Sequence, residues 1–431
     1  MGGTVRTFAR IVVPILIFAA AIPASVAHAA GVTRTTLTIG FFIPEPQRAS
    51  VSEPSPVDRR RMLNAVVDWI DRNGGIAGRR VLWYAYWATA EGDSLDPSSQ
   101  ERAACLSFEQ TSFAAVSVVP TSRTFNDCLA RRATVFIPDS LHDFATASYM
   151  RAHRTQLFAP SDLSIDRWST SVVDGLFDRG FLTGRTRIGV ISYDDPSWTR
   201  VLRDVVSPTI AKRGGHLVST YVFPQGEDAA TQAQVVHEMI GSPGVPGAVP
   251  GFNANAVDRV LFLSGRGLVR RFAEVAQTFR YFPRYGLSTP NDLADLEQPQ
   301  WAGALDGAEA IGWMPGRDVN VVRSVRNASA GRCADIMARA DIDLSAPAAA
   351  DDAFAICDGL FFLRAALKSA TQVTSASLAA AVDRLGTSYT GARTFATEFG
   401  PRRHDGASSV RALRFDTSCN CFRYIGSGGT S

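Results

Sequence analysis

The chain has 431 residues, 46% of them hydrophobic and 20% charged, so it is long and apolar enough to form two globular domains. Its net charge of +3 is small for this length, and Lys212 and Lys368 are the only lysines among 44 basic residues. The arginines are scattered among acidic residues and form no basic stripe with interleaved aromatic residues. The composition therefore argues against a nucleic-acid-binding protein.

The N-terminus has the pattern of a secretory signal. Arg6 and Arg10 precede an apolar run at 11–22, and small residues follow at 27–30. A basic segment, an apolar run too short to span a bilayer and a small-residue cleavage site predict a signal peptide over residues 1–30. The mature chain would then be exported, to a periplasmic, cell-envelope or extracellular location. A retained membrane anchor is the alternative, and no Cys follows the run to carry a lipid.

Six cysteines lie in the exported part, and an even count in an oxidising compartment favours disulfides over metal binding or catalysis. Proximity in the sequence suggests Cys105–Cys128 and Cys333–Cys357, which leaves Cys419 and Cys421 as a pair. The connectivity stays open, because six cysteines allow many pairings and a C-x-C ring is strained. No C-x-x-C or His-rich spacing of a zinc site occurs.

Residues 37–87 predict a strand–helix–strand unit. The apolar run 37–43 predicts a strand, and apolar residues at helical spacing between Met62 and Ile70 predict a helix. The helix is expected to end at Asn73-Gly74-Gly75, because Gly tolerates the left-handed conformation that closes a helix. The aromatic and β-branched segment 81–87 predicts a buried strand. Such a unit is one right-handed parallel crossover and indicates an α/β fold.

Two further strands of this unit are predicted to end in polar turns. Residues 98–110 and 125–132 predict helices, and 113–119 and 134–137 predict strands. In parallel sheets, ligands bind beyond the carboxyl ends of the strands, where backbone N–H groups and helix N-termini point outward. Helix capping and turn formation are the alternative roles for polar residues there. The candidate ligand-binding residues in these turns are Thr121, Ser122, Asp139 and Ser140.

The alternation of elements starts again near residue 157, which predicts a second domain. Trp198 follows the strand 187–193 at the start of a helix. An aromatic ring at the rim of a cleft is a candidate ligand contact, and packing at a helix start is the alternative. The other predicted elements are helices at 164–181, 199–213, 229–240 and 268–279 and strands at 216–223, 259–264 and 285–288, with 241–255 as a Gly/Pro-rich surface segment without a core signal.

Ser264 and Arg266 follow the strand 259–264 and are further candidates for a ligand contact. Arg266 is suited to pair with a ligand carboxylate, although an ordinary solvated loop residue is the commoner role for such an arginine.

Several stretches resemble, in order along the chain, the type I periplasmic binding proteins, and specifically the branched-chain amino acid (Leu/Ile/Val) binding family. They are NGGIAGRRV at 73–81, RIGVISYDDPSWT at 187–199, AEAIGWMP at 308–315, the helix 350–370 and RHDG at 403–406. The resemblance implies an α/β fold of two doubly wound lobes, with mostly parallel sheets, joined by three hinge crossovers. The expected N-terminal lobe comprises residues 31–156 and 318–385, and the C-terminal lobe 157–317 and 386–431.

The resemblance also implies roles for the candidate residues. The turns at 120–122 and 138–140 would bind the α-carboxylate of a ligand, and Trp198 stands where the family has a Tyr that closes over it. Asn291 or the adjacent Asp292 lies near the position of the acid that holds the ligand ammonium in the family. The Pro-rich loop 44–56 departs from the family, because it lacks the usual glycines.

The function that the resemblance implies is that of a solute-binding protein of an ABC importer. It would be a monomer that captures a small amino-acid-like or carboxylated ligand by hinge closure and then docks on the importer's permease. An exported sensor that signals to a membrane receptor is one alternative. A hydrolase on the same scaffold is another, with His142 and His404 as the residues to test. The chain lacks the H-E-x-x-H, G-x-S-x-G and P-loop motifs, so we predict no enzyme, cofactor or metal.

Overall fold

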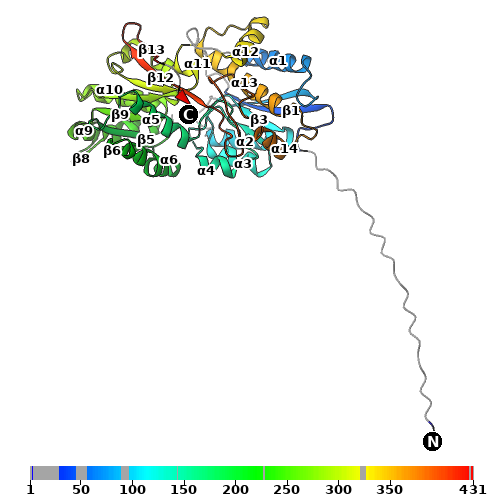
Figure 1. Cartoon of the computed structure of the whole chain (residues 1–431), viewed down its shortest axis with the longest axis horizontal. Coiled ribbons are helices and arrows are strands. Elements are labelled where there is room, and N and C mark those ends of the chain that lie inside the picture. The colour runs from blue at the N-terminus through cyan, green and yellow to red at the C-terminus, as the bar shows by residue number, and fades with distance from the viewer. Residues whose placement is uncertain are drawn as a thin grey trace.

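The computed structural model describes residues 2, 29–44, 56–88, 97–142, 144–226, 229–320, 327–426 and 429–430. The predicted signal peptide and the Pro-rich loop lie almost wholly outside these residues. Two lobes lie side by side along the long axis of the molecule, one around β1 and β3 and the other around β5 and β9 (Figure 1). In the part of the chain that is described, no helix is long and apolar enough to cross a membrane.

The first lobe is built on a parallel sheet of 4 strands with the spatial order β2-β1-β3-β4. The chain moves outward on both sides of β1, as in doubly wound folds. The strands are β1 (Thr36–Pro44), β2 (Arg80–Ala88), β3 (Ala114–Ser117) and β4 (Val135–Ile137). The helices of this lobe are α1 (Pro56–Arg72), α2 (Pro97–Thr111), α3 (Arg123–Arg131), α4 (Ala147–Ala152), α12 (Ala328–Arg339), α13 (Pro347–Ala366) and α14 (Ser375–Val382).

Helices from two distant parts of the chain cover the two faces of this sheet. Phe41 packs with α1, α12 and α13, whereas its neighbour Phe42 packs with α2 and α3, because successive strand residues point to opposite faces. Burial on both faces explains the continuous apolar run of β1. A Cβ at Gly40 would lie 2.5 Å from the Phe108 ring, so the close approach of α2 requires glycine there.

The second lobe is built on a sheet of 8 strands, in which β6, β5, β9, β10 and β11 are parallel and β12 and β13 antiparallel. The strands are β5 (Arg187–Tyr193), β6 (His216–Phe223), β9 (Arg259–Phe262), β10 (Arg284–Ser288), β11 (Glu309–Gly312), β12 (Ser409–Asp416), β13 (Cys421–Tyr424) and β14 (Gly429–Thr430), with β7 (Gly241–Ser242) and β8 (Val245–Pro246) as a separate hairpin.

Helices also cover both faces of the second sheet. One face packs against α5 and against a continuous helix made of α6, the π-helical turn η1 and α7, while the other packs against α8, α9 and α10. Short 3-10 turns and α11 complete the lobe. The helices and turns of the second lobe are α5 (Ile165–Asp178), α6 (Pro196–Val201), η1 (Leu202–Val206), α7 (Ser207–Lys212), α8 (Ala229–Ile240), α9 (Ala248–Ala254), α10 (Arg266–Thr278), η2 (Thr289–Asn291), η3 (Leu293–Leu296), η4 (Pro299–Trp301) and α11 (Pro315–Asp318).

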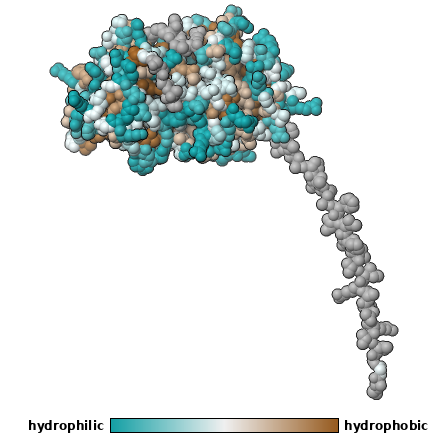
Figure 2. Space-filling model, viewed as in Figure 1, coloured by the Kyte–Doolittle hydropathy of each residue, from teal (hydrophilic) through white to brown (hydrophobic). Residues whose placement is uncertain are grey.

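The α/β class and the two doubly wound lobes agree with the prediction, and two local predictions are wrong. The strand predicted as buried, β2, is an edge strand, and its Leu82 and Tyr84 are 44% and 41% exposed. The segment 241–255 is not a surface excursion, because it contains α9, whose Val249 and Phe252 are fully buried. Hydrophilic side chains cover most of the face seen in Figure 2, and smaller hydrophobic areas are scattered among them.

The chain passes three times between the lobes, before α5, after β11 and before β12. The three crossings lie side by side. Ala159 of the first forms a parallel bridge with Asp405 of the third, and the Thr394 hydroxyl donates to the carbonyl of Trp313 in the second, at 2.8 Å. Hydrogen bonds between crossings make the lobe junction a single packed unit.

The disulfides follow the pairing that proximity suggested. Cys105–Cys128 joins α2 to α3 and Cys333–Cys357 joins α12 to α13, with Cα–Cα distances of 6.2 and 6.0 Å. The third disulfide, Cys419–Cys421, closes across one residue between β12 and β13.

Candidate functional site

The carboxyl ends of the two sheets meet at the lobe junction. His142, in the loop after β4, lies edge-on to the ring of Trp168 at the start of α5, with centroids 6.1 Å apart. Close to His142, the buried Asp162 accepts hydrogen bonds from the backbone N–H of Leu141 at 2.6 Å and from Trp313 Nε1 at 3.0 Å. Asp162 therefore ties the first-lobe loop to the first and second crossings. Burial raises the pKa of this carboxyl above its usual value.

Three fully buried tryptophans, Trp168, Trp198 and Trp313, form a cluster at the carboxyl end of the second sheet. Trp168 packs edge-to-face on Trp198 with ring centroids 4.9 Å apart, and lies 6.3 Å from Trp313. The Trp168 Nε1 donates to Ser288 Oγ at 2.9 Å. Trp198 was expected at a cleft rim as a ligand contact. Its side chain is fully buried in the cluster, which agrees with the alternative of packing at a helix start, and its role in ligand binding stays a prediction.

Four buried polar atoms at the carboxyl ends of strands have no hydrogen-bond partner among the described residues. Thr121 Oγ1 and Ser140 Oγ follow β3 and β4 of the first sheet. Ser192 Oγ lies at the end of β5, on the face of Ile188 and Val190, and Trp198 Nε1 lies on the same face of the sheet. An unsatisfied buried donor costs about 1–3 kcal/mol, and at the carboxyl end of a parallel sheet such an atom is a candidate to be completed by a ligand or water.

The other predicted ligand contacts after β3, β9 and β10 are engaged within the protein. Ser122 caps α3 by accepting from the N–H of Phe125, and its own N–H donates to Glu101 Oε1 at 2.7 Å. The Asn291 side chain accepts from the N–H of Ser288 at 2.7 Å and donates to the Ser264 carbonyl at 2.7 Å. Ser122 thus has the capping role that was the alternative for the turns after the first-lobe strands, and Asn291 joins the ends of β9 and β10.

Arg266 is paired within its own lobe. Its guanidinium contacts Asp295 and lies 3.8 Å from Asp292, and its side chain is 42% exposed. A ligand carboxylate would have to displace these partners, so the structure gives Arg266 a local role.

Asp139 belongs to a cluster of two arginines and two aspartates at the junction, hereafter the ion cluster: Asp139, Arg317, Asp351 and Arg393. Arg317 and Arg393 each lie 2.8 Å from both carboxylates. The Asp139 side chain is 0% exposed and that of Arg393 6%. Burial opposes ionisation of Asp351, but the two guanidinium groups outweigh it and hold the pKa of Asp351 below its usual value.

The ion cluster connects elements that are far apart in the sequence. Asp139 follows β4, Asp351 lies in α13, and Arg317 and Arg393 lie at the second and third crossings. Arg317 Nε also lies 3.8 Å from Asp292 in the second lobe. A small cavity with a volume of about 20 Å³ borders Arg317, Asp351 and Arg393, and its other lining residues include Met314, Ala330, Ala350 and Phe354.

Sequence reasoning missed Arg317, Arg393 and the partners of Asp351. The neighbouring aspartates 351 and 352 have separate partners: Asp352 pairs with Arg59 at 2.7 Å, and Asp351 pairs with the two junction arginines. Adjacent helical residues point about 100° apart, which lets the pair serve two separate partners. Two adjacent acidic residues in a helix therefore indicate two separate ion pairs, but the sequence alone does not identify their partners.

One histidine of the described part of the chain lies beside a hydroxyl group: His237 Nε2 is 3.2 Å from Ser242 Oγ, and both residues are exposed on the second lobe. His404 Nε2 lies 2.9 Å from Asp383, rather than meeting its sequence neighbour Asp405, and burial lowers the pKa of His404. Among the described residues, one group has the spacing of metal ligands: Cys105, Glu109 and Cys128. Both of its cysteines are in a disulfide, which leaves no thiolate for a metal.

Comparison with known proteins gives structural neighbours only. No family model and no curated protein matches the sequence. A branched-chain amino acid ABC transporter protein from Thermus thermophilus with bound valine matches with a TM-score of 0.61 and 13% identity, over 93% of this chain and 98% of that one. A fatty acid ABC transporter substrate-binding protein from Thermomonospora curvata has a TM-score of 0.62 and 13% identity, over 95% and 96%.

A type 1 periplasmic binding protein from Bordetella pertussis Tohama I matches with a TM-score of 0.59 and 18% identity, over 91% of this chain and 100% of that one. The matches extend over nearly the whole of both chains in each case. The chain therefore has the two-lobed α/β fold of the type I periplasmic binding proteins, as its motifs predicted.

Proposed function

We propose that this protein is an extracytoplasmic solute-binding protein of an ABC importer, which captures a small carboxylated or amino-acid-like ligand between its lobes by hinge closure. The proposed lobes are residues 31–156 with 318–385 and residues 157–317 with 386–431. The strand content of the two sheets supports this division, because β1–β4 fall in the first lobe and β5–β14 in the second. The signal-like N-terminus supports export of the mature chain.

One observation carries the proposal: Thr121 Oγ1, Ser140 Oγ, Ser192 Oγ and Trp198 Nε1 are buried and unpartnered at the carboxyl ends of strands from both sheets, within the described residues. The carboxyl end of a parallel sheet is where α/β proteins bind ligands. A ligand held by atoms of both lobes has more contacts in the closed form than in the open one, and this difference is what drives closure.

The chemistry of these four groups favours a ligand with a carboxylate. All four groups can donate a hydrogen bond to a carboxylate; the three hydroxyls can also accept one, whereas the indole N–H cannot. Each ionisable group described above at the strand ends already has a protein partner, so the free donors call for an acceptor-rich ligand rather than an amine. Two of the neighbours named above are a protein with bound valine and a fatty acid ABC transporter substrate-binding protein, and both valine and fatty acids contain a carboxylate.

Thermal unfolding of the refolded mature chain, in the presence of single compounds, tests the proposal. The library contains amino acids, aromatic acids and aliphatic acids, each with its amide and its amine. A ligand at about 100 times its Kd adds about 2.7 kcal/mol to the stability of the folded state and raises the midpoint. We expect one class of carboxylates to raise it, and the matching amines not to.

Substitutions then locate the site. Ser140→Ala and Thr121→Val remove hydroxyls with little change of shape and should weaken binding of the best carboxylate at least about tenfold, since a hydrogen bond to a charged group is worth about 1.5–3 kcal/mol. Ser219→Ala is the matched control, because its buried hydroxyl is also unpartnered but lies within β6 rather than at its end. Equal binding by all variants, or no shift with any carboxylate, would contradict the proposal.

A further inference from the structure

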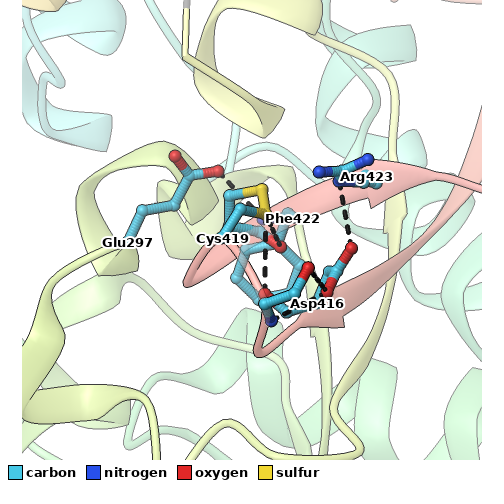
Figure 3. The surroundings of a disulfide bond; sticks show 7 residues. Glu297, Asp416, Cys419, Phe422 and Arg423 are labelled. Atoms are coloured by element: carbon cyan, nitrogen blue, oxygen red, sulfur yellow. Dashed lines mark hydrogen bonds and ion pairs between the residues drawn. A yellow bond between two sulfur atoms is a disulfide. The ribbon is translucent and has the colours of Figure 1, made fainter.

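The turn between β12 and β13 carries a disulfide unlike the other two. Cys419 is exposed at the turn, while Cys421 is 1% exposed at the start of β13. Asn420 between them has a φ of 50°, in the left-handed region that Asn tolerates better than most residues. Figure 3 shows this disulfide at the tip of the hairpin, with Asp416, Phe422 and Arg423 around it.

The other two disulfides have the features of structural cross-links. Their four sulfurs belong to residues that are at most 8% exposed, and each bond joins two helices across 23 or 24 residues. A long closed loop restricts the unfolded chain strongly, and a buried sulfur is inaccessible to an attacking thiolate. Cys419–Cys421 spans 2 residues and joins no separate elements, so its opening removes little restraint from the fold.

We infer that Cys419–Cys421 is a thiol–disulfide exchange site, entered at Cys419. An incoming thiolate attacks Cys419 Sγ and forms a mixed disulfide with it. The bond between the two cysteines breaks, and its electron pair leaves on Cys421, which takes a proton from water. A second thiolate attacks the sulfur of the bound thiol, releases Cys419 as a thiolate and leaves with the first thiol as an oxidised disulfide.

Contacts around the turn keep the hairpin in place when the disulfide opens. The Phe422 N–H donates to Glu297 Oε1 at 2.9 Å, and Arg423 pairs with Asp416 at 3.1 Å. Four residue pairs, from Leu413–Tyr424 to Asp416–Cys421, hold β12 to β13. Cys419 Sγ lies 3.5 Å from the Asp416 carbonyl oxygen, which is placed to accept a hydrogen bond from the reduced thiol. The exchange is therefore local and reversible.

The test uses the intact mature protein in native buffer with reduced and oxidised glutathione in graded ratios. Samples are quenched with acid, alkylated and digested, and the state of each cysteine is read by mass spectrometry. We expect Cys419 to carry glutathione, or both Cys419 and Cys421 to be alkylated, at least about tenfold faster than any of the four core cysteines reacts. A parallel series with a reduced dithiol oxidoreductase separates attack by a small thiol from attack by a protein thiol.

Reaction in either series at Cys419 supports the inference and identifies the source of the thiolate. The inference fails if this disulfide opens no faster than Cys105–Cys128 and Cys333–Cys357, or if it opens only in denaturant. It also fails if glutathione is found on Cys421 instead of Cys419. The Cys419→Ser/Cys421→Ser variant should keep the wild-type circular dichroism spectrum and show no labelling in this peptide, which checks that the hairpin does not depend on the bond.

Discussion

Replacing Arg393 by Met should reveal how strongly the ion cluster holds the lobe junction. The side chain of Arg393 is 6% exposed and lies 2.8 Å from both Asp139 and Asp351. Its loss leaves two carboxylates, one of them fully buried, with Arg317 as their remaining partner in the cluster. Removing one partner of a buried ion pair costs about 3–5 kcal/mol, and we expect the lower end because the Asp351 side chain is 32% exposed.

The pH dependence of this loss follows from the pKa of Asp351. In the native protein the two arginines hold that pKa below its usual value, so its favourable contribution is present at neutral pH and is lost only in strong acid. Without Arg393 the folded-state pKa rises, because burial is no longer outweighed to the same extent. Protonation then relieves the excess negative charge, so the stability gap to the parent protein should narrow as the pH falls from 7 toward 4.

Urea denaturation of the mature protein, followed by the fluorescence of its 7 tryptophans, measures this effect. Arg271→Met is the control, since Arg271 makes a half-exposed pair with Glu274 and should cost less than about 1 kcal/mol. The double variant Arg393→Met/Asp139→Asn should be more stable than the sum of the two single losses predicts, because it removes a charge together with its partner. A loss below 1 kcal/mol for Arg393→Met, or a loss independent of pH, would refute this reasoning.

Three further predictions concern single features. Burial raises the pKa of Asp318 to about 7, so the folded state binds this proton more tightly than the unfolded state. The resulting contribution to stability is lost as the pH rises from about 4 through 7. The urea midpoint of the Asp318→Asn variant should therefore depend less on pH over that range than the midpoint of the parent protein. Cys333→Ala/Cys357→Ala should cost about 3 kcal/mol in the same assay, and Cys419→Ala/Cys421→Ala only about half as much, because the closed loop is shorter. Trp198→Phe keeps an aromatic ring in the cluster but removes the unpartnered N–H, so isothermal titration should show weaker ligand binding with little loss of stability, and unchanged affinity would exclude this N–H as a contact.

The elements of the fold could be predicted because local composition determines them. β1 and β5 are apolar and β-branched or aromatic runs, and α1 shows helical periodicity and ends at Gly74 and Gly75, both with positive φ. The burial of an element was less predictable, because it depends on neighbours that the pattern does not specify. β2 has the composition of a core strand but lies at a sheet edge, and Gly and Pro in 241–255 masked the core residues Val249 and Phe252.

The sequence predicts where a candidate site lies, but not which side chains face it. The alternation of strands and helices predicts that Thr121, Ser140 and Trp198 lie just beyond the carboxyl ends of β3, β4 and β5. Whether a polar residue there faces a ligand or completes a turn depends on partners far away in the sequence. Arg393 contacts an aspartate 254 residues away, and no local pattern carries that information.

The distribution of the free donors suggests how binding and closure are divided between the lobes. Thr121 and Ser140 belong to the first lobe, while Ser192 and Trp198 belong to the second. A ligand that first binds one lobe gains the donors of the other only on closure, so the second pair contributes to the closed state alone. The ion cluster differs from these donors, because Arg317 and Arg393 lie at the crossings and pair with first-lobe carboxylates within the protein itself. In the proposed mechanism, closure is therefore governed by the ligand contacts, whereas the ion cluster stabilises the junction between the lobes.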